Sequence, residues 1–508
     1  MTGERTNAEK DGADGRKGVG IAARPRPLES IDAWAGDFDV VIVGLGIAGG
    51  AAAIEALRAG ARTLVLERAT RGGGTTALSE CTIYLGGGTR VQKANGFDDT
   101  VDLMQAHLRA AAGPTADPEK VRLYCEGSLE HFDWLEGIGV EFKDTYHDDK
   151  VIFPPGDDCL IFSGNEQAWP FSAESTPMPR GHKPKWDGPA GGYVMEKVIR
   201  TIEELGGTIQ NESRVEQLVD DAEGRVVGVV ARVAGGPGGA SETVCIRARR
   251  GVILTAGGFV MNREMCRQYA PHLTRLKLPT ASEGDDGSGI LLGLSAGGAA
   301  VNMDEGLVMT PYFPPNSHLK GILVSAQGQR FINEDCYHGR VSDAILRKAD
   351  GRAFLIVDDE IYGKTMVPYR MAAIAESFEE LERELGLPEG NLVHTLDYYN
   401  RHAEKGEDPL FHKAAKYLKP LTAAPFAALD LGLDTSPWAG FTLGGLDTRP
   451  TGEVRTASGE IVPGLYAAGR TSAGLTRSGR FYASGMSVGG GSFFGRLAGR
   501  QAATRPQS

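Results

Sequence analysis

Three glycines and one glutamate have the residue types and the spacing to bind the phosphates and ribose of a dinucleotide. Gly44, Gly46 and Gly49 form the pattern Gly-x-Gly-x-x-Gly, and Glu67 follows further along the chain. The first glycine of such a pattern permits a tight turn, the second lets a pyrophosphate approach the backbone, and the third lets a helix pack closely on a strand. A carboxylate at the position of Glu67 would accept hydrogen bonds from ribose hydroxyls.

The elements that must position these residues occur in the required order. Residues 40–43 are an apolar, β-branched run that predicts a strand, residues 51–57 have a helical pattern, and residues 63–66 predict a second strand that ends at Glu67. A glycine pattern alone would be weak evidence, because the chain contains 70 glycines. The series of strand, turn, helix, strand and acid favours a dinucleotide site over an ordinary turn.

Composition narrows the class of protein. With 508 residues, 41% hydrophobic and 24% charged, the chain can bury large cores and is expected to form two domains. Its net charge of −12, spread without long runs, argues against nucleic acid and anionic membranes as partners. No apolar stretch predicts stable membrane insertion. Residues 1–35 are expected to be a disordered tail without a secretory signal, which predicts a cytoplasmic protein.

Cysteine and histidine spacing predicts no metal site. The 6 cysteines lie far apart without a Cys-x-x-Cys pair, which is typical of reduced thiols, and no His-Glu-x-x-His pattern occurs.

Further segments have recognisable patterns. Residues 154–192 are rich in Pro, Gly, Ser and Asn and predict either an ordered loop or lid, or a solvated linker. Composition changes near residue 300, which suggests an inserted second domain over residues 301–439. The other expected elements are helices in residues 100–140, 193–205, 378–385 and 392–405, and strands in residues 226–233, 243–248, 251–256 and 321–324, with a turn at 235–239.

Taken together, these residues resemble the FAD-dependent fumarate reductase and 3-ketosteroid dehydrogenase superfamily. The matching segments are Glu67 and residues 44–49, 255–258, 328–334, 442–445, 464–469 and 485–492. The resemblance implies an α/β fold, in which a Rossmann-like FAD-binding domain is split by an inserted α+β catalytic cap domain. It implies that the FAD-binding domain comprises residues 36–300 and 440–508, that the cap comprises residues 301–439, and that the active site lies between them at the isoalloxazine.

The resemblance also implies FAD as the cofactor. Flavoproteins of this layout that attach the flavin covalently have a histidine in the glycine-rich stretch after Glu67, where this chain has none, so we expect noncovalent FAD. The predicted cofactor-binding residues are Gly44, Gly46, Ile47, Ala48, Gly49, Glu67, Arg68, Gly74, Thr75, Thr76, Ala256, Gly257, Gly469, Arg470, Ser487 and Val488.

The chain departs from fumarate reductases at three places that bind a dicarboxylate. Where those enzymes continue the Asn-Glu of residues 333–334 with Thr-Thr-Arg, this chain continues with Asp, Cys, Tyr and His. Their carboxylate-binding histidine is replaced by Phe441, and their carboxylate-clamping arginine by Tyr482. A phenol cannot supply the charge of a bidentate arginine. The sequence therefore favours a neutral, apolar substrate.

At these places the chain is similar to the flavin-dependent 3-ketosteroid dehydrogenases, above all to those acting at the bond between steroid carbons 4 and 5. The similarity implies Tyr337, Tyr482 and Ser484 as catalytic residues. Dehydrogenation beside a ketone requires a donor at the ketone oxygen and a base at the neighbouring carbon. We assign Tyr482, with a nearby backbone N–H, to the ketone and Tyr337 with Ser484 to the proton path; the reversed roles stay open.

Two arginines complicate this interpretation. Arg477 and Arg480 precede Tyr482 and bring cations toward the expected pocket. Surface salt bridges are the favoured interpretation, whereas an inward-pointing Arg480 would indicate a substrate that carries a carboxylate.

The favoured function is therefore an oxidoreductase that introduces or reduces a C=C bond next to a ketone, first of all by 3-ketosteroid 4-dehydrogenation. It would use a small apolar ketone, expected to be a steroid, and an external electron acceptor. The alternatives are a reductase of unsaturated acids such as fumarate or urocanate, and a flavin-binding electron carrier without a substrate of its own.

Overall fold

One large sheet carries the dinucleotide motif. A computed structural model describes residues 23–235 and 239–505, and among them this sheet has 9 strands. Their order is β1-β8-β9-β10-β2-β3-β7, with β21 paired to β10 and β20 paired to β21. The strands are β1 (Arg26–Pro27), β2 (Gly36–Val43), β3 (Thr63–Leu66), β7 (Thr208–Gln210), β8 (Ser213–Asp220), β9 (Val226–Val233), β10 (Glu242–Leu254), β20 (Glu453–Arg455) and β21 (Ile461–Ala467).

The centre of the sheet is parallel. β2 pairs in parallel with β3 and β10, and the end of β10 pairs in parallel with β21. Val43, Leu254 and Ala467, the last residues of β2, β10 and β21, are therefore neighbours in register. Ligands of such sheets bind beyond the carboxyl ends of the strands. This edge of the sheet is where a dinucleotide is expected.

The strands predicted at residues 243–248 and 251–256 form a single strand, β10. Its register against β2 shifts between Ala248 and Gly251. The first half of β10 pairs antiparallel with β9, while its second half pairs with β21. The irregularity lets one long strand join the antiparallel β8-β9 hairpin to the parallel centre.

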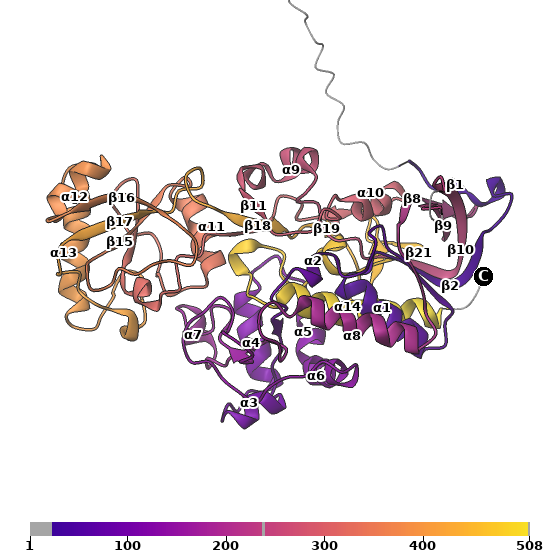
Figure 1. Cartoon of the computed structure of the whole chain (residues 1–508), viewed down its shortest axis with the longest axis horizontal. Coiled ribbons are helices and arrows are strands. Elements are labelled where there is room, and N and C mark those ends of the chain that lie inside the picture. The colour runs from indigo at the N-terminus through magenta and orange to yellow at the C-terminus, as the bar shows by residue number, and fades with distance from the viewer. Residues whose placement is uncertain (1–22, 236–238, 506–508) are drawn as a thin grey trace, which may run out of the picture.

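Three helices lie side by side on one face of the sheet (Figure 1): α1 (Ile47–Arg58), α8 (Gly191–Glu204) and α14 (Met486–Thr504). α1 is rich in alanine and α14 in glycine, which allows the two backbones to approach closely. A Cβ on Gly495 would lie 2.4 Å from the carbonyl oxygen of Ala48, and a Cβ on Gly499 would lie 2.2 Å from that of Ala52. Small residues are thus a condition of this packing.

A helical region flanks these helices, and the helices predicted in residues 100–140 are found there. Residues 154–192 contain two short strands and one short helix, and about half of them are buried, so they form an ordered loop and not a solvated linker. The elements are α3 (Arg90–Ala94), α4 (Val101–Ala111), α5 (Pro118–Glu126), α6 (Ser128–Gly137) and α7 (Phe171–Glu174), with the small sheet of β4 (Ile83–Tyr84), β6 (Gly181–His182) and β5 (Leu160–Ile161).

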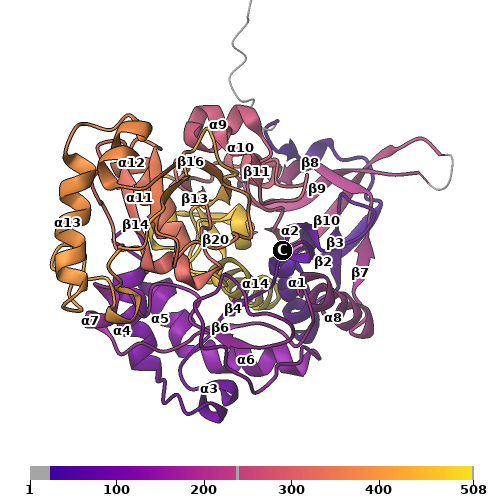
Figure 2. The ribbon, with the colours of Figure 1, turned by 60° about the vertical axis from the view of Figure 1, so that its left-hand side comes forward.

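A second lobe is built on a four-stranded antiparallel sheet in the order β14-β15-β17-β16. Figures 1 and 2 show it in orange at one end of the molecule, with helices packed on the sheet. The predicted helices at 378–385 and 392–405 and the strand at 321–324 are present within a few residues. Its elements are β14 (Ile322–Ser325), β15 (Ala353–Val357), β16 (Arg370–Ala375), β17 (Phe426–Asp430), α11 (His338–Lys348), α12 (Phe378–Leu385) and α13 (Asn391–Ala403).

Short strands join the two lobes. β18, on the chain returning from the second lobe, pairs with β13, on the chain entering it, and with β11. The α/β fold class with an inserted α+β region is as predicted; boundaries at residues 300 and 439 stay predictions. The joining elements are α2 (Gly74–Ala77), α9 (Arg263–Tyr269), β11 (Leu278–Pro279), α10 (Ser288–Ser295), β12 (Ala300–Val301), β13 (Gly306–Met309), β18 (Ala439–Thr442) and β19 (Gly445–Leu446).

The predicted tail, residues 1–35, is in part folded. Up to residue 22 it lies outside the described residues, as does the middle of the turn predicted at 235–239. Arg26–Pro27 pairs with β8 and Leu28–Ser30 forms a 3-10 helix, so disorder does not extend to residue 35. The reason is burial of apolar surface, since Leu28, Ile31 and Trp34 pack against a small cluster of valines.

Within residues 23–235 and 239–505, no helix is long and apolar enough to cross a membrane. The same residues contain no cluster of three or more His, Cys, Asp or Glu side chains that could hold a metal ion.

Candidate active site

The glycine turn after β2 has the geometry that its sequence predicts. Gly44 has φ +99°, and a Cβ there would lie 2.7 Å from the carbonyl oxygen of Thr255. A Cβ on Gly49 would lie 2.0 Å from the carbonyl oxygen of Gly44, whereas the atom nearest to a Cβ on Gly46 is Thr76 Oγ1, at 3.7 Å. Gly44 and Gly49 thus permit the turn and the helix packing, and Gly46 leaves its backbone open to a ligand.

Glu67 braces this turn. Its Oε2 accepts a hydrogen bond from the Leu45 N–H at 2.8 Å, and its Oε1 accepts one from the Ala69 N–H at 2.9 Å. Each carboxylate oxygen can accept a further bond, so the side chain can hold the turn and still bind a ribose hydroxyl. The buried Glu67 therefore links the end of β3 to the start of α1.

All the predicted site residues except Gly49 line one cleft. The cleft runs along the carboxyl ends of β2, β3, β10 and β21, past the N-termini of α1 and α14, to the second lobe. Gly49 does not line the cleft, and its lack of a side chain lets α1 pack closely against the turn. The predicted residues that line the cleft are Gly44, Gly46, Ile47, Ala48, Glu67, Arg68, Gly74, Thr75, Thr76, Ala256, Gly257, Tyr337, Gly469, Arg470, Tyr482, Ser484, Ser487 and Val488.

This cleft fits a dinucleotide cofactor. Two glycines on its wall, Gly46 and Gly74, would carry a Cβ with no protein atom outside the adjoining chain closer than 3.7 Å, so a bound group can lie against their backbone. The N-terminus of the 19-residue helix α14 adds N–H groups and a partial positive charge.

Sequence reasoning missed Asp285, which organises the middle of the cleft. This buried carboxylate accepts hydrogen bonds from Thr75 Oγ1 at 3.0 Å and from the Gly258 N–H at 3.1 Å, and it forms an ion pair with Arg470. Its partners come from widely separated parts of the chain, so no local pattern reveals them. The only local signal was the Asp-Asp-Gly-Ser-Gly run, which predicts the start of a helix.

Three side chains with hydroxyl groups line the end of the cleft beside the second lobe. Tyr337 OH and Ser484 Oγ lie 3.1 Å apart, and the ring centroids of Tyr337 and Tyr482 are 6.4 Å apart. Tyr482 OH accepts a hydrogen bond from the Ser487 N–H at 3.2 Å. Burial raises the pKa of both tyrosines above that of an ordinary phenol, so both are protonated at neutral pH.

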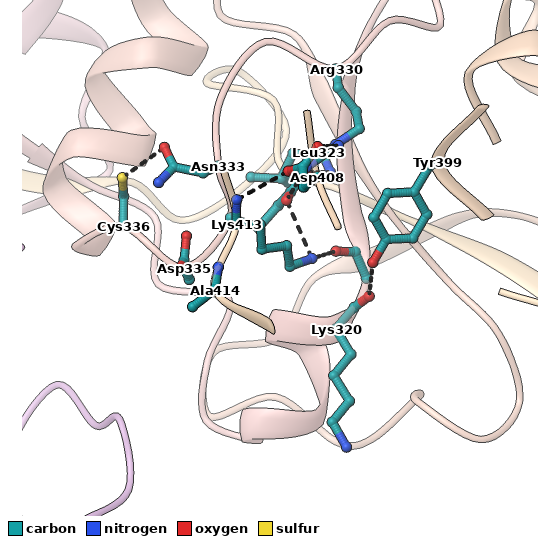
Figure 3. A network of polar contacts seen from close by, with 12 residues as sticks. Lys320, Leu323, Arg330, Asn333, Asp335, Cys336, Tyr399, Asp408, Lys413 and Ala414 are labelled. Atoms are coloured by element: carbon teal, nitrogen blue, oxygen red, sulfur yellow. Dashed lines mark hydrogen bonds and ion pairs between the residues drawn. The ribbon is translucent and has the colours of Figure 1, made fainter. Parts of the chain in front are cut away.

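A buried ion network in the second lobe holds the chain segment just before Tyr337 (Figure 3). Arg330 lies 2.8 Å from Glu334 and 2.9 Å from Asp408, and Lys413 Nζ lies 3.2 Å from Glu334. The side chains in these pairs are almost fully buried. The network fixes the loop over residues 330–335, and the chain then enters α11 at Tyr337.

The surroundings of the hydroxyl groups are mainly apolar. Leu307, Met309 and Phe441 line the cleft and lie in or against the apolar cluster that contains Tyr337 and Tyr482. Such walls would bury the rings of an apolar substrate. A nearby cation is Arg470, which lies over the Phe441 ring at 5.1 Å and whose charge is paired with Asp285.

The two arginines singled out in the sequence do not line this cleft. Arg480 is exposed and lies over the Phe481 ring at 5.4 Å. Arg477 lies 3.7 Å from Asp117 and 3.7 Å from Asp447. Arg477 therefore forms salt bridges, as favoured from the sequence. The side chain of Arg480 does not point into the cleft.

Comparison with known proteins adds independent evidence. The sequence profile of a family described as FAD binding domain matches residues 39–485. The chain is 28% identical to the 3-oxo-5-alpha-steroid 4-dehydrogenase of Comamonas testosteroni, over 86% of this chain and 93% of that protein. It is also 28% identical to the urocanate reductase of Eggerthella lenta, over 92% of this chain and 75% of that protein.

A solved structure has higher identity. The chain is 44% identical to the 3-ketosteroid-Δ4-(5α)-dehydrogenase of Rhodococcus jostii RHA1, whose crystal structure contains 4-androstene-3,17-dione. The match covers 95% of this chain and 100% of that chain, with a TM-score of 0.89. A flavocytochrome c3 fumarate reductase, 23% identical with a TM-score of 0.63, shares the fold.

Proposed function

This chain belongs to the FAD-dependent 3-ketosteroid dehydrogenases of the fumarate reductase superfamily, and on that premise we propose that it dehydrogenates 3-ketosteroids at the bond between carbons 4 and 5. It is an FAD-dependent oxidoreductase. The observation that carries the steroid proposal is the Tyr337–Ser484 hydroxyl pair beside Tyr482, at an apolar end of the cleft without an arginine clamp.

FAD in this cleft would supply the acceptor for a hydride. Its pyrophosphate would be held at Gly46 and the N-terminus of α1, and its ribose at Glu67. The hydroxyl groups of Tyr337, Tyr482 and Ser484 would then face the substrate from both lobes.

Tyr482 suits the ketone end of the substrate. Its oxygen already accepts the Ser487 N–H, so its own proton is free to be donated to a ketone oxygen. The N-terminus of α14 begins at Met486 and adds a partial positive charge beside the phenol. Both groups stabilise the negative charge that develops on the oxygen when the neighbouring carbon loses a proton.

Tyr337 and Ser484 suit the proton that leaves the carbon. In their hydrogen bond one hydroxyl donates to the other, which leaves a lone pair on the donor free to accept a proton from the substrate. Buried, protonated hydroxyls cannot store a proton, so the pair acts as a relay and the proton has to move on.

The competing function, reduction of unsaturated acids such as fumarate or urocanate, lacks a comparable observation. Phe441 and Tyr482 stand in the cleft at the places where the resemblance expects carboxylate-binding residues, and both are neutral. Arg470 lies over the Phe441 ring, but its charge is paired with Asp285. The proposal also includes an external electron acceptor and residence in the cytoplasm.

Anaerobic photometry of the FAD-loaded protein tests the proposal. We expect the 5α-saturated counterpart of 4-androstene-3,17-dione to bleach the flavin absorbance, because the substrate then reduces it. Fumarate and urocanate should fail to reoxidise enzyme that has been reduced chemically. Reoxidation by fumarate without bleaching by the steroid would favour the competing function, and neither response would favour an electron carrier.

A further inference from the structure

A loop from the first lobe braces both catalytic segments. Asn165 Oδ1 accepts a hydrogen bond from the Tyr337 N–H at 2.9 Å. Ser163 exchanges two hydrogen bonds with the backbone of Ser484: its carbonyl oxygen accepts the Ser484 N–H at 3.0 Å, and its Oγ donates to the Ser484 carbonyl oxygen at 3.0 Å. The loop thus fixes the two residues whose hydroxyls form the proton relay, and it brings the next residue, Glu166, beside them.

Glu166 is a fully buried carboxyl group with an unused oxygen. Its Oε2 accepts the Gly164 N–H at 2.9 Å, while its Oε1 makes no well-formed hydrogen bond among the described residues, although the Tyr84 hydroxyl is close enough to interact with the carboxyl group. A Cβ added to Gly164 would lie 3.3 Å from either carboxylate oxygen and 2.7 Å from the Cβ of Ala483. The carboxyl group therefore lies close to the chain segment, residues 483–484, that carries Ser484.

Two more buried polar atoms lie in the same place. These are the Tyr84 hydroxyl and Arg180 Nη1, which make no well-formed hydrogen bond among the described residues, although Tyr84 is close enough to interact with both Arg180 and Glu166. Arg180 is held by Asp99, 2.7 Å from its Nη2, and the Tyr84 N–H donates to the Gly485 carbonyl oxygen at 3.3 Å. Burial, and after it the charge of Glu166, raises the pKa of Tyr84, whereas Arg180 opposes this rise.

Unsatisfied buried polar atoms are rare and are typical of sites that hold water or exchange protons. Burial also raises the pKa of Glu166, which brings a carboxyl group closer to taking up a proton at neutral pH. Burial and then Tyr482 raise the pKa of Tyr337, the hydrogen bond with Ser484 lowers it, and the charge of Glu166 makes a smaller contribution that raises it. Glu166 therefore interacts electrostatically with the hydroxyl pair that must pass a proton on.

We propose that Glu166 is the proton acceptor behind the Tyr337–Ser484 relay, with Tyr84 and Arg180 completing its site. This inference rests on the proposed dehydrogenation. As the C=C bond forms, one carbon loses a hydride to FAD, and its neighbour loses a proton to the hydroxyl pair. The pair passes one proton to the Glu166 carboxylate, which becomes a carboxylic acid, so electrons and protons balance. Glu166 acts through the relay and does not touch the substrate.

Reaction-induced infrared difference spectra test this inference. The FAD-loaded protein is mixed anaerobically with the saturated 3-ketosteroid while the flavin absorbance is followed. We expect the C=O band of a carboxylic acid to appear as the flavin bleaches in the wild type. Glu166→Gln should lack this band and bleach about 10²-fold more slowly, the lower end of the loss for a positioned acid or base. Glu166→Asp keeps the carboxyl group and should recover part of the rate.

Glu174→Gln is the matched control, because Glu174 is exposed and follows in the same loop; it should keep both the band and the rate. FAD content and near-ultraviolet circular dichroism show which variants fold. If Glu166→Gln does not fold, Tyr84→Phe replaces it, and it should shift the band and slow bleaching. A wild type that bleaches without the band, or a folded Glu166→Gln that bleaches at the wild-type rate, overturns the inference. A wild type that the steroid does not bleach instead overturns the proposed function itself.

Discussion

At the scale of single residues, the hydroxyl groups of Tyr337 and Tyr482 decide the proposed mechanism. Their rings are buried in an apolar cluster, so Phe can replace either ring without opening a cavity. We expect Tyr337→Phe and Tyr482→Phe each to lower turnover by about 10²- to 10⁴-fold, the usual loss for a positioned acid or base. Flavin reduction by the steroid is the measurement, with FAD content as the control for folding. Rates within a few-fold of wild type in both variants would make these residues packing residues.

A second residue, Glu67, is expected both to hold the glycine turn and to bind the ribose of FAD. Glu67→Ala removes the acceptor for the Leu45 and Ala69 N–H groups as well as the expected ribose contact. We expect weaker FAD retention in gel filtration and a stability loss of about 1–3 kcal/mol, because buried donors are left unpaired. Glu67→Gln keeps one acceptor oxygen and should fall between wild type and Glu67→Ala. Full FAD retention in Glu67→Ala would contradict a ribose-binding role.

At the scale of elements, the α1–α14 contact leaves no room for a side chain at Gly495 or Gly499. A side chain at Gly499 would meet the backbone of Ala52, with a Cβ at 2.2 Å from its carbonyl oxygen. Backbone cannot yield as a flexible side chain can, so we expect Gly499→Ala to destabilise the protein by about 1–3 kcal/mol or more, as overpacking does. Denaturant unfolding of the FAD-loaded protein measures this.

Gly137→Ala in α6 is the matched control for Gly499→Ala, because no atom lies within 4 Å of a Cβ there. It should leave the unfolding midpoint near that of the wild type. Equal midpoints for the two variants would show that α1 and α14 can separate without cost, and that their small residues are not required.

At the scale of the whole molecule, the FAD site exists only in the folded chain. Its walls come from the ends of strands far apart in sequence and from the N-termini of α1 and α14. No histidine stands among the cleft-lining residues that the structure describes. We therefore expect acid precipitation, which unfolds the protein, to release yellow flavin into the supernatant at one FAD per chain. Flavin that stays with the precipitate would show a covalent bond.

The sequence by itself was sufficient for the features that depend on neighbouring residues. The glycine turn, the strands around it and Glu67 lie within one short segment, so their types and spacing predict their geometry. The same holds for α12 and β9, whose predicted bounds agree with the structure. The two motifs that we propose for the active site could be picked out because each lies within a few consecutive residues.

Only the tertiary structure decided which distant residues meet. Asp285 binds Thr75 and Arg470 across the cleft, and Asn165 binds Tyr337 across the lobes. The hydrophobic periodicity of the sequence does not predict such pairs, because each residue fits its own helix, strand or loop equally well without its distant partner. The ordered loop over residues 154–192 was likewise undecidable from composition, since Pro, Gly and Ser suit a solvated linker as well as a buried brace. Its order comes from burial against two other segments, which only the folded chain brings together.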